Sequence, residues 1–257
     1  MSKHTSLLLC ILFLLTLAGC SGRNSGGTDI NSSHAATTSS LDDDDSYLDE
    51  AYESQLVADP LEGWNRAMFV VNDKLVTFVA RPLSNAYTTV TPQFFREGTN
   101  NFFTNLLFPV RFVNNLLQGK GTAAGQEFGK FFINTTAGIG GVFNVAAKTH
   151  PELSALDTED FGQTLGVWGM SEGVYLYWPL LGPSSVRDSV GQVGDWAADP
   201  LTWLKPVWAS YTLKGVRAIN SLEDTLDLYD SMTKSAIEPY TAIRDAFTQY
   251  RRAKIAK

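Results

Sequence analysis

The chain has 257 residues, in which 20 Lys and Arg stand against 27 Asp and Glu, for a formal net charge of −7. An acidic chain without a basic cluster binds nucleic acid poorly, so we expect no nucleic-acid partner. The two cysteines, Cys10 and Cys20, both lie near the start of the chain. We therefore expect packing alone to hold the folded part, which is long enough for one sizeable core.

The N-terminal segment has the layout of a secretory signal. Lys3 precedes an apolar run over residues 7–17, and small residues stand directly before Cys20. A cysteine in this place is typical of bacterial lipoproteins, in which the thiol is acylated and the chain is cut before it. We therefore expect residues 1–19 to be a signal peptide and Cys20 to be the lipidation site.

The residue after the acylated cysteine indicates the destination. Ser21 follows Cys20, whereas Asp there is the usual inner-membrane retention signal in enteric-type bacteria. The sequence therefore predicts an outer-membrane lipoprotein, anchored in the inner leaflet and facing the periplasm. An ordinary signal peptide or an uncleaved anchor is the alternative, but the apolar run is too short to span a bilayer comfortably.

Residues 20–58 are rich in Ser, Gly, Thr, Asn and Asp and include four consecutive aspartates, Asp42 to Asp45. Such a segment buries too little apolar surface to offset its ordering entropy. We expect a flexible tether between the lipid anchor and a folded domain over residues 59–253. The acidic run as a metal or partner site is the alternative.

The first predicted helix opens at Asp59, with Pro60 at its first position and Glu62 completing a capping box. Apolar residues then recur at spacings of three and four along one face. This face carries Leu61, Trp64, Met68, Phe69, Val71, Leu75 and Phe78. Asn65 and Asn72, one heptad apart, fall inside it, either as structural amides or as the lining of a polar passage.

Further helices are predicted in chain order, and period-two alternation is scarce. Helices are expected from Thr91 to Leu106, from Phe108 to Leu117, from Thr122 to the glycines at 138–141, and over residues 158–168, 184–198, 206–230 and 236–253. Only residues 174–178 alternate like a strand. The predicted class is therefore all-α, a single domain of amphipathic helices with little or no sheet.

Aromatic residues are numerous for such a chain, with 15 Phe, 6 Trp and 9 Tyr. Wide apolar faces with many aromatic rings suit either a large core or helices that lie in a membrane interface. The lipid anchor favours the interface. The candidate membrane-facing residues are Trp64, Met68, Phe69, Phe94, Phe95 and Phe102.

Catalytic chemistry finds little support in the sequence. Residues 169–173 form a G-x-S-x-G pattern around Ser171, but an extended stretch follows it instead of a helix, and no histidine follows His150. Zinc would have to rely on carboxylates, because the predicted domain holds one histidine and no cysteine. We therefore expect no enzyme activity, no metal and no cofactor.

A set of ordered motifs spans about residues 59–250. The motifs are Asp59-Pro60-Leu61-Glu62-Gly63-Trp64-Asn65-Arg66, Arg81-Pro82, Asn101-Phe102, Asn105-Leu106, Leu117-Gln118-Gly119, Phe131-Phe132-Ile133-Asn134-Thr135, Gly138-Ile139-Gly140-Gly141, Phe161-Gly162-Gln163-Thr164-Leu165-Gly166, Pro179-Leu180-Leu181-Gly182-Pro183-Ser184 and Glu238-Pro239-Tyr240. Together these motifs resemble the MlaA/VacJ lipoprotein family. The acidic tail that some members carry after the last helix has no counterpart here.

The resemblance implies a ring of helices lying in the inner leaflet, associated with an outer-membrane porin trimer. It also implies that misplaced phospholipids are taken from the outer leaflet and handed to a soluble periplasmic lipid carrier. A ring that is polar inside would admit the headgroup, and Asn65, Asn72, Asn101 and Asn105 are its candidate lining. Gly138, Gly140 and Gly141 are either a helix cap or a hinge, and we expect a hinge. The competing interpretations are a passive envelope scaffold and a lipid or peptidoglycan hydrolase.

The lipidation site gives the first prediction. The intact mass of the protein purified from membranes should show loss of residues 1–19 and addition of a diacylglyceryl group at Cys20. The variant Cys20→Ala should carry neither change. An unmodified thiol at Cys20 in the purified protein would contradict the prediction.

Overall fold

The computed structural model describes residues 59–153 and 156–257, which belong to one compact unit of the chain. The predicted signal peptide, Cys20 and the tether lie outside the described residues. The described chain is predominantly α-helical and has one small two-stranded sheet, which confirms the predicted class.

The described part of the chain opens with a long, almost continuous helical stretch that is α-helical at both ends and π-helical between them. It consists of α3 (Glu62–Leu75), the π-helical segment η1 (Val76–Ala80) and α4 (Arg81–Val90). The predicted capping box is wrong, because α3 starts at Glu62 with Leu61 at the N-cap. The Asp59 carboxylate instead accepts hydrogen bonds from the Asn65 amide and the Tyr240 hydroxyl.

The next part of the chain is a series of helices joined by short turns. These are α5 (Gln93–Leu106), α6 (Phe108–Leu117), α7 (Gly121–Thr136), α8 (Val145–Thr149), the 3-10 turn η2 (Pro151–Leu153) and α9 (Phe161–Val167). Proline explains two of the starts: Pro92 stands at the N-cap of α5, and Pro109 lies in the first turn of α6.

The last part holds the hairpin and the remaining helices. They are β1 (Tyr175–Trp178), β2 (Gly182–Ser185), α10 (Val186–Ala198), the 3-10 turn η3 (Pro200–Trp203), α11 (Val207–Asn220), α12 (Leu222–Thr233) and α13 (Pro239–Ile255). The single helix predicted over residues 206–230 is wrong, because the chain breaks at Ser221. The second strand was also missed, since residues 184 and 185 were assigned to the following helix.

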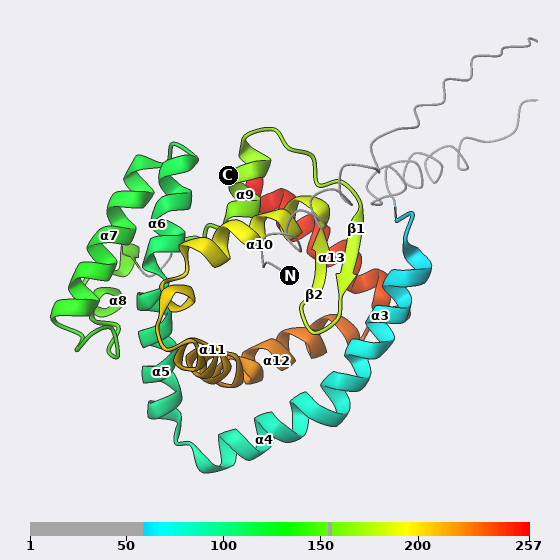
Figure 1. The fold of residues 1–257 in the computed structure, drawn as a ribbon, viewed down its shortest axis with the longest axis horizontal. Helices are drawn as coiled ribbons and strands as arrows, with labels where there is room; N and C mark the ends of the chain where they lie inside the picture. The colour runs from blue at the N-terminus through cyan, green and yellow to red at the C-terminus, as the bar shows by residue number, and fades with distance from the viewer. Residues whose placement is uncertain (1–58, 154–155) are drawn as a thin grey trace, which may run out of the picture. The chain divides into compact units, whose positions relative to one another are not determined.

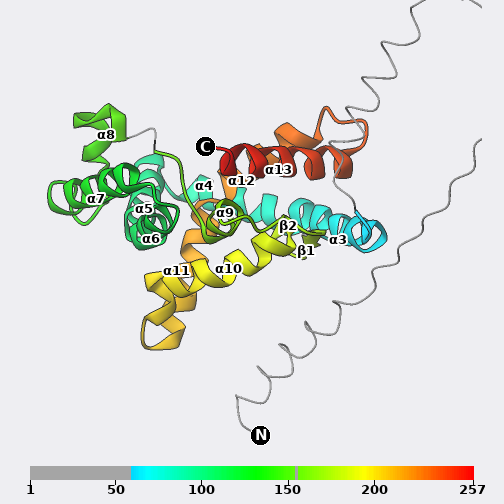
Figure 2. The ribbon, with the colours of Figure 1, turned by 90° about the horizontal axis from the view of Figure 1, so that it is seen from above.

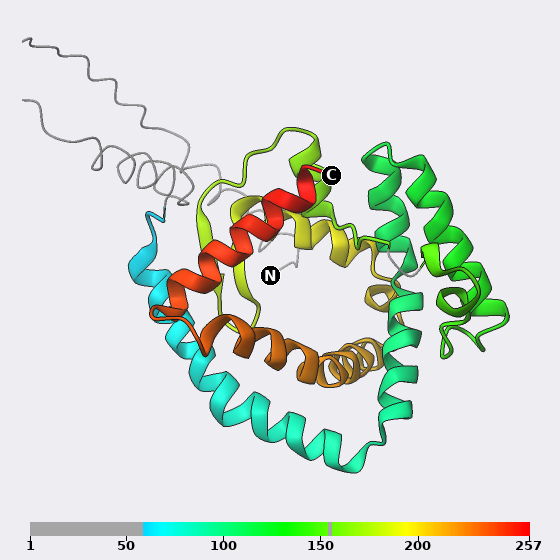
Figure 3. The same cartoon turned by 180° about the vertical axis from the view of Figure 1, so that it is seen from behind.

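Within this unit the elements follow a closed circuit (Figure 1). The run α3–η1–α4 leads through α5 to α6, α6 contacts α10, α10 contacts β2, and β1 returns to α3. Helices α11 and α12 pack along α4, and α12 also packs along η1. Seen from above, α13 lies on one face of the circuit and α10 with α11 on the other, and the view from behind shows α13 crossing the hairpin (Figures 2 and 3).

The apolar core is small and aromatic, and it sits where α13 covers the hairpin. Tyr175 and Tyr177 of β1 meet Tyr240 and Ile243 of α13, and all four are almost completely buried. Phe69 packs edge-on against both Tyr177 and Tyr240, with ring centroids 5.8 and 6.0 Å apart.

Two predicted membrane-facing residues, Met68 and Phe69, are partly buried against the Tyr175–Ile243 core. At these positions the apolar face of α3 packs towards the hairpin, and contact of the two residues with lipid stays a prediction.

Two asparagines of α3 attach the hairpin to the first helix. The Asn65 carboxamide donates to the Tyr175 carbonyl at 3.0 Å and accepts from the Tyr177 N–H at 2.8 Å. Asn72 donates to the Trp178 carbonyl at 2.8 Å and accepts from the Leu180 N–H at 2.7 Å. Asn65 thus replaces a neighbouring strand along β1, whereas Asn72 holds the end of β1 and the turn that follows it.

The spacing of the two asparagines matches that of the strand. Seven residues of an α-helix rise about 10.5 Å, and three residues of a strand advance about 10 Å. Asn65 and Asn72 therefore meet peptide groups three residues apart along the hairpin. The heptad spacing noted in the sequence reflects this structural role. Asn72 also borders a pocket of about 320 Å³, and the lining of a passage by these amides stays a prediction.

These bonds predict a specific loss of stability. Asn65→Leu should lower the free energy of unfolding by about 2–4 kcal/mol, because two buried backbone groups of β1 lose their partner. Unfolding by urea in detergent, followed by circular dichroism, measures this. Asn85→Leu, on an exposed position of α4, is the matched control, and equal stability of the two variants would contradict the clamp.

Candidate functional site

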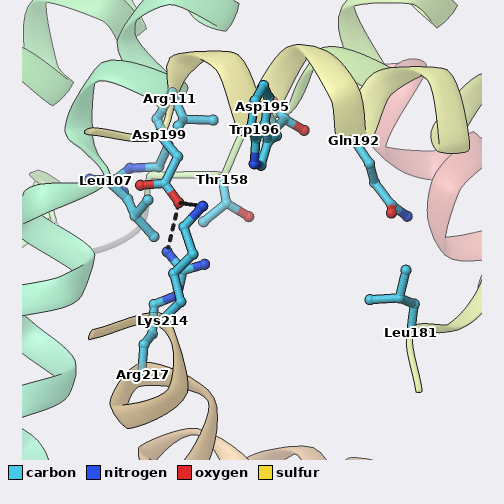
Figure 4. Close-up of a pocket in the computed structure, with 11 residues that line it drawn as sticks. Leu107, Arg111, Thr158, Leu181, Gln192, Asp195, Trp196, Asp199, Lys214 and Arg217 are labelled. Carbon is cyan, nitrogen blue, oxygen red and sulfur yellow. Dashed lines mark hydrogen bonds and ion pairs between the residues drawn. The ribbon is translucent and has the colours of Figure 1, made fainter. Parts of the chain in front are cut away.

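A charged pocket lies where α6, α10 and α11 approach one another (Figure 4). Its volume is about 540 Å³. The wall is formed by Leu107, Val110, Arg111, Thr158, Leu181, Gln192, Asp195, Trp196, Asp199, Lys214 and Arg217. We call it the α10–α11 pocket.

The helical repeat explains why α10 and α11 contribute most of the charged groups. Gln192, Asp195, Trp196 and Asp199 are spaced by three, one and three residues, so they lie on one side of α10 and its C-cap. Lys214 and Arg217 are three residues apart on α11 and also share one face. The pocket forms because the chain between these helices turns through η3 and brings the two faces together.

One wall of the pocket is an ion cluster around Asp199. Its Oδ1 accepts the Leu201 N–H at 2.9 Å and so caps η3. Its Oδ2 lies 3.4 Å from Arg217 Nη1 and 3.8 Å from Lys214 Nζ. Lys214 Nζ also donates to Thr202 Oγ1 at 2.8 Å. Asp199 is buried, whereas both cations are partly exposed.

A second carboxylate, Asp195, lies on the same wall of α10. Its Oδ1 accepts from the Phe161 N–H at 2.9 Å and from Asn114 Nδ2 at 3.1 Å. Burial raises the pKa of Asp195 to about 6, although the hydrogen bond from Phe161 opposes this shift. The carboxylate is therefore mainly ionised at neutral pH but close to titration.

A buried ion network joins α10 to α13 and to the start of α9. The Arg251 guanidinium binds the Asp160 carboxylate through two bonds, at 2.6 and 2.9 Å, and Asp188 at 2.5 Å. Burial acts to raise the pKa of Asp160, but the adjacent Arg251 lowers it overall. Gly162 is required here, because a Cβ would lie 2.5 Å from Asp188 Oδ1. Arg251 thereby joins α13 to the N-cap of α9 and to α10.

Arg111 reaches the pocket wall but is already paired. Its Nε donates to Glu127 Oε2 at 2.9 Å and its Nη1 to the Thr104 carbonyl at 2.9 Å. Both side chains of the ion pair are buried. This pair joins α6 to α7 and gives the pocket a fixed wall.

The surface of the described chain is unusually apolar, and its interior is unusually polar. Buried polar and charged residues outnumber buried apolar ones. Large apolar side chains are exposed on most elements, among them Trp64, Phe78, Val90, Phe94, Phe95, Phe128, Phe132, Ile139, Leu180, Trp196, Trp203, Trp208 and Tyr211. No helix over residues 59–153 and 156–257 has the length and apolar character that crossing a membrane requires.

The predicted membrane-facing residues thus divide into two groups. Trp64, Phe94 and Phe95 are exposed, with 52%, 66% and 58% of their surface accessible. Phe102 is half-buried and packs edge-on against Phe103. Exposed aromatic rings of α5 therefore remain candidates for contact with lipid, in contrast to the residues of α3 that face the hairpin.

The predicted channel asparagines of α5 bind α7 and the turn that follows it. Asn101 Nδ2 donates to the Val142 carbonyl at 3.2 Å, and Asn105 Nδ2 donates to Thr135 Oγ1 at 2.9 Å. Asn105 is buried, whereas Asn101 is partly exposed. These contacts give both amides a structural role, and both side chains border a small cavity of about 10 Å³.

Backbone conformation and close packing explain why glycine occupies the positions of the predicted hinge. Gly140 and Gly141 have φ angles of +68° and +95°, which favour glycine. A Cβ on Gly141 would lie 2.4 Å from the Asn105 Cβ, and one on Gly138 would lie 2.2 Å from the Phe143 carbonyl oxygen. The Phe143 N–H also donates to the Gly138 carbonyl at 2.9 Å. The turn is closely packed, and its action as a hinge stays a prediction.

The candidate catalytic residues do not come together. Ser171 is exposed in the loop before β1, and His150 pairs with Glu152 at 3.2 Å on the surface. In the described part of the chain no group of three or more His, Cys, Asp or Glu side chains is placed to hold a metal ion.

Sequence analysis did not single out the pocket residues. Asp195, Asp199, Lys214 and Arg217 read as solvated polar positions of amphipathic helices. A usable signal was present, because the polar positions at 192, 195 and 199 form a stripe beside the apolar face of the helix predicted over residues 184–198. The stripe faces Lys214 and Arg217 only because the tertiary fold brings α11 back beside α10.

The geometry defines a class: a predominantly helical protein with an apolar exterior, a polar interior and a charged pocket. The family model for the MlaA lipoprotein matches residues 57–254. The chain belongs to the MlaA lipoprotein family. The apolar exterior and the charged pocket described above are therefore features of this chain as a member of that family.

Individual relatives agree with this assignment. Proteins named intermembrane phospholipid transport system lipoprotein MlaA from Shigella flexneri and Escherichia coli K12 are each 34% identical over 75% of this chain and 76% of their own length. The protein of that name from Haemophilus influenzae is 30% identical over 77% of this chain and 79% of its own length. A solved structure described as "Structural basis for maintenance of bacterial outer membrane lipid asymmetry" matches with a TM-score of 0.68 and 33% identity, over 77% of this chain and 99% of that chain.

The raised pKa of Asp195 gives a prediction on stability. The folded state holds the proton up to about pH 6, whereas an unfolded Asp releases it near pH 3.9. The contribution of Asp195 to stability is therefore greatest below about pH 4 and falls as the pH rises through 6. The variant Asp195→Asn keeps a side-chain oxygen that can accept from the Phe161 N–H. Because its amide does not titrate, this variant does not lose stability as the pH rises.

The melting temperature of Asp195→Asn minus that of the unaltered protein should accordingly be larger at pH 7.5 than at pH 4. Thermal unfolding in detergent at both pH values measures the difference. Asp224→Asn, on the exposed surface of α12, should show no such change, and a pH-independent difference for Asp195→Asn would contradict the prediction.

Proposed function

We propose that this lipoprotein removes misplaced phospholipids from the outer leaflet of the outer membrane and passes them to a soluble periplasmic carrier. It acts within an intermembrane phospholipid transport system that maintains outer-membrane lipid asymmetry. The names of the relatives from Shigella flexneri, Escherichia coli and Haemophilus influenzae support this function. Transport needs no bond to be made or broken, so the proposal requires no catalytic residue.

The observation that carries the proposal is the inverted distribution of side chains. Phe94, Phe95 and Trp208 expose most of their surface, while charged groups such as Arg251 and Asp188 are buried and paired. Exposed aromatic and aliphatic side chains over so many elements are unfavourable in water but favourable in acyl chains. We infer that the helical circuit lies in the inner leaflet of the outer membrane, tethered by the acylated Cys20.

The α10–α11 pocket supports the passage of a headgroup. A phospholipid that moves through an apolar surround needs a polar route for its charged headgroup, because a charge in hydrocarbon costs several kcal/mol. Asp195, Asp199, Lys214 and Arg217 supply such a surface within one pocket. Leu107 and Val110 of the same pocket offer apolar contacts to the glycerol end.

The partners in the proposal are an outer-membrane porin trimer and the periplasmic carrier. The exposed apolar side chains of α5 and α7, such as Phe94 and Phe128, are suited to a lipid or porin surface. The turn at Gly138–Gly141 would act as a hinge between α7 and α8. A passive envelope scaffold would share the lipid anchor but would not need the pocket.

The apolar surface predicts how the protein responds to charge. Phe94→Glu combined with Phe95→Glu should expose phospholipid on the cell surface, because two carboxylates on α5 oppose insertion into the leaflet. Outer-leaflet phospholipid labelling, together with sensitivity to detergent plus chelator, measures this. The levels of mature protein in membranes must be matched between strains.

Three variants serve as controls. Gln93→Glu adds a carboxylate to an exposed polar position of the same helix, and Ser171→Ala and His150→Ala test the hydrolase interpretation. All three should keep lipid asymmetry. Normal asymmetry in the doubly charged variant, or loss of asymmetry in Ser171→Ala, would contradict the proposed function.

A further inference from the structure

We propose that the α10–α11 pocket selects zwitterionic phospholipid headgroups, with the phosphate bound at Lys214 and Arg217 and the ammonium group bound at Asp195, within the negative field of Asp195 and the neighbouring Asp199. This inference rests on the proposed function and specifies its substrate class. It follows from the arrangement of charges in the pocket, from their partners and from the aromatic ring beside them.

The pocket contains two available cations and two carboxylates. Lys214 and Arg217 come from α11, and Asp195 and Asp199 come from α10 and its C-cap. The third cation of the wall, Arg111, is committed to the buried Glu127. The available charges therefore balance when Asp195 is ionised, as they do in a headgroup that carries one phosphate and one ammonium.

The contacts of both cations with Asp199 are long, although Lys214 Nζ also donates to Thr202 Oγ1 at 2.8 Å. Charge-assisted N–H···O bonds are about 2.7–2.9 Å long, whereas Asp199 Oδ2 lies 3.4 Å from Arg217 Nη1 and 3.8 Å from Lys214 Nζ. A guanidinium carries five N–H donors and an ammonium three. Most of these donors are therefore available to phosphate oxygens without loss of the Asp199 contact.

Asp195 and the Trp196 ring offer a site for the ammonium group. Both hydrogen bonds to Asp195 end on Oδ1, so Oδ2 is the oxygen available to an ammonium group. The Trp196 ring belongs to the same wall, is 56% exposed and already attracts Lys214 Nζ at 6.0 Å from its centroid. An aromatic face next to carboxylates is a favourable place for an ammonium group.

This arrangement discriminates against anionic headgroups. A phosphoglycerol headgroup offers the phosphate but no cation, so Asp195 and Asp199 would face additional negative charge without compensation. Selectivity then arises from repulsion of the wrong lipid as well as from attraction of the right one. The geometry therefore assigns the carboxylates as specificity-determining residues and the cations as phosphate-binding residues.

The experiment compares two lipids with identical acyl chains, phosphatidylethanolamine and phosphatidylglycerol, at equal concentration. The full-length acylated protein, purified in detergent, is equilibrated with mixed micelles at pH 7.5, and bound lipid is counted by native mass spectrometry. We expect phosphatidylethanolamine to be bound in preference by roughly tenfold, which corresponds to about 1.4 kcal/mol.

Variants of the pocket separate the two roles. Asp195→Asn and Asp199→Asn keep the hydrogen-bond acceptors but remove the charge, and together they should bring the ratio of the two lipids close to one. Lys214→Gln with Arg217→Gln should lower the binding of both lipids. Asp224→Asn, an exposed carboxylate of α12 outside the pocket, is the matched control and should leave the ratio unchanged.

The outcomes distinguish this inference from the function on which it rests. Equal binding of both lipids, preference for phosphatidylglycerol, or an unaltered ratio in Asp195→Asn/Asp199→Asn would overturn the selectivity while the transport function stands. Failure of the unaltered protein to bind either lipid would contradict the proposed function itself. Circular dichroism of each variant establishes that its helical content is retained.

Discussion

The attachment of the hairpin to α3 is the interaction on which the circuit depends. Asn65 and Asn72 hold β1 and the turn after it through four hydrogen bonds to their backbone. The other edge of β1 pairs with β2, which leads directly into α10. Because α10 carries Asp195 and ends at Asp199, the position of the pocket wall follows from two side chains at the start of the chain.

The proposed position in a lipid leaflet gives polar packing of this kind a physical reason. A ring in a lipid leaflet gains little from burying leucines, since the acyl chains are as apolar as a protein core. Paired charges and amides that face inward, such as Arg251 with Asp160 and Arg111 with Glu127, can still specify how the helices join. The aromatic cluster beneath α13 is a local exception that fixes the hairpin.

The pocket and the apolar exterior together connect the fold with lipid transport. Exposed side chains such as Phe94 and Trp208 suit contact with acyl chains, whereas Lys214 and Arg217 suit a phosphate. Neither feature involves the G-x-S-x-G pattern around Ser171. Family membership and side-chain distribution thus agree on transport, although they rest on independent observations.

Local periodicity by itself determined the helical class, most helix positions and the apolar faces, because these depend on neighbours within one or two turns. It also singled out Asn65 and Asn72 but left their role open. Only the tertiary structure decided that these amides bind a strand more than 100 residues away and that Met68 faces the core. The α10–α11 pocket likewise depends on a return of the chain through η3, and no local pattern specifies which distant charges will meet.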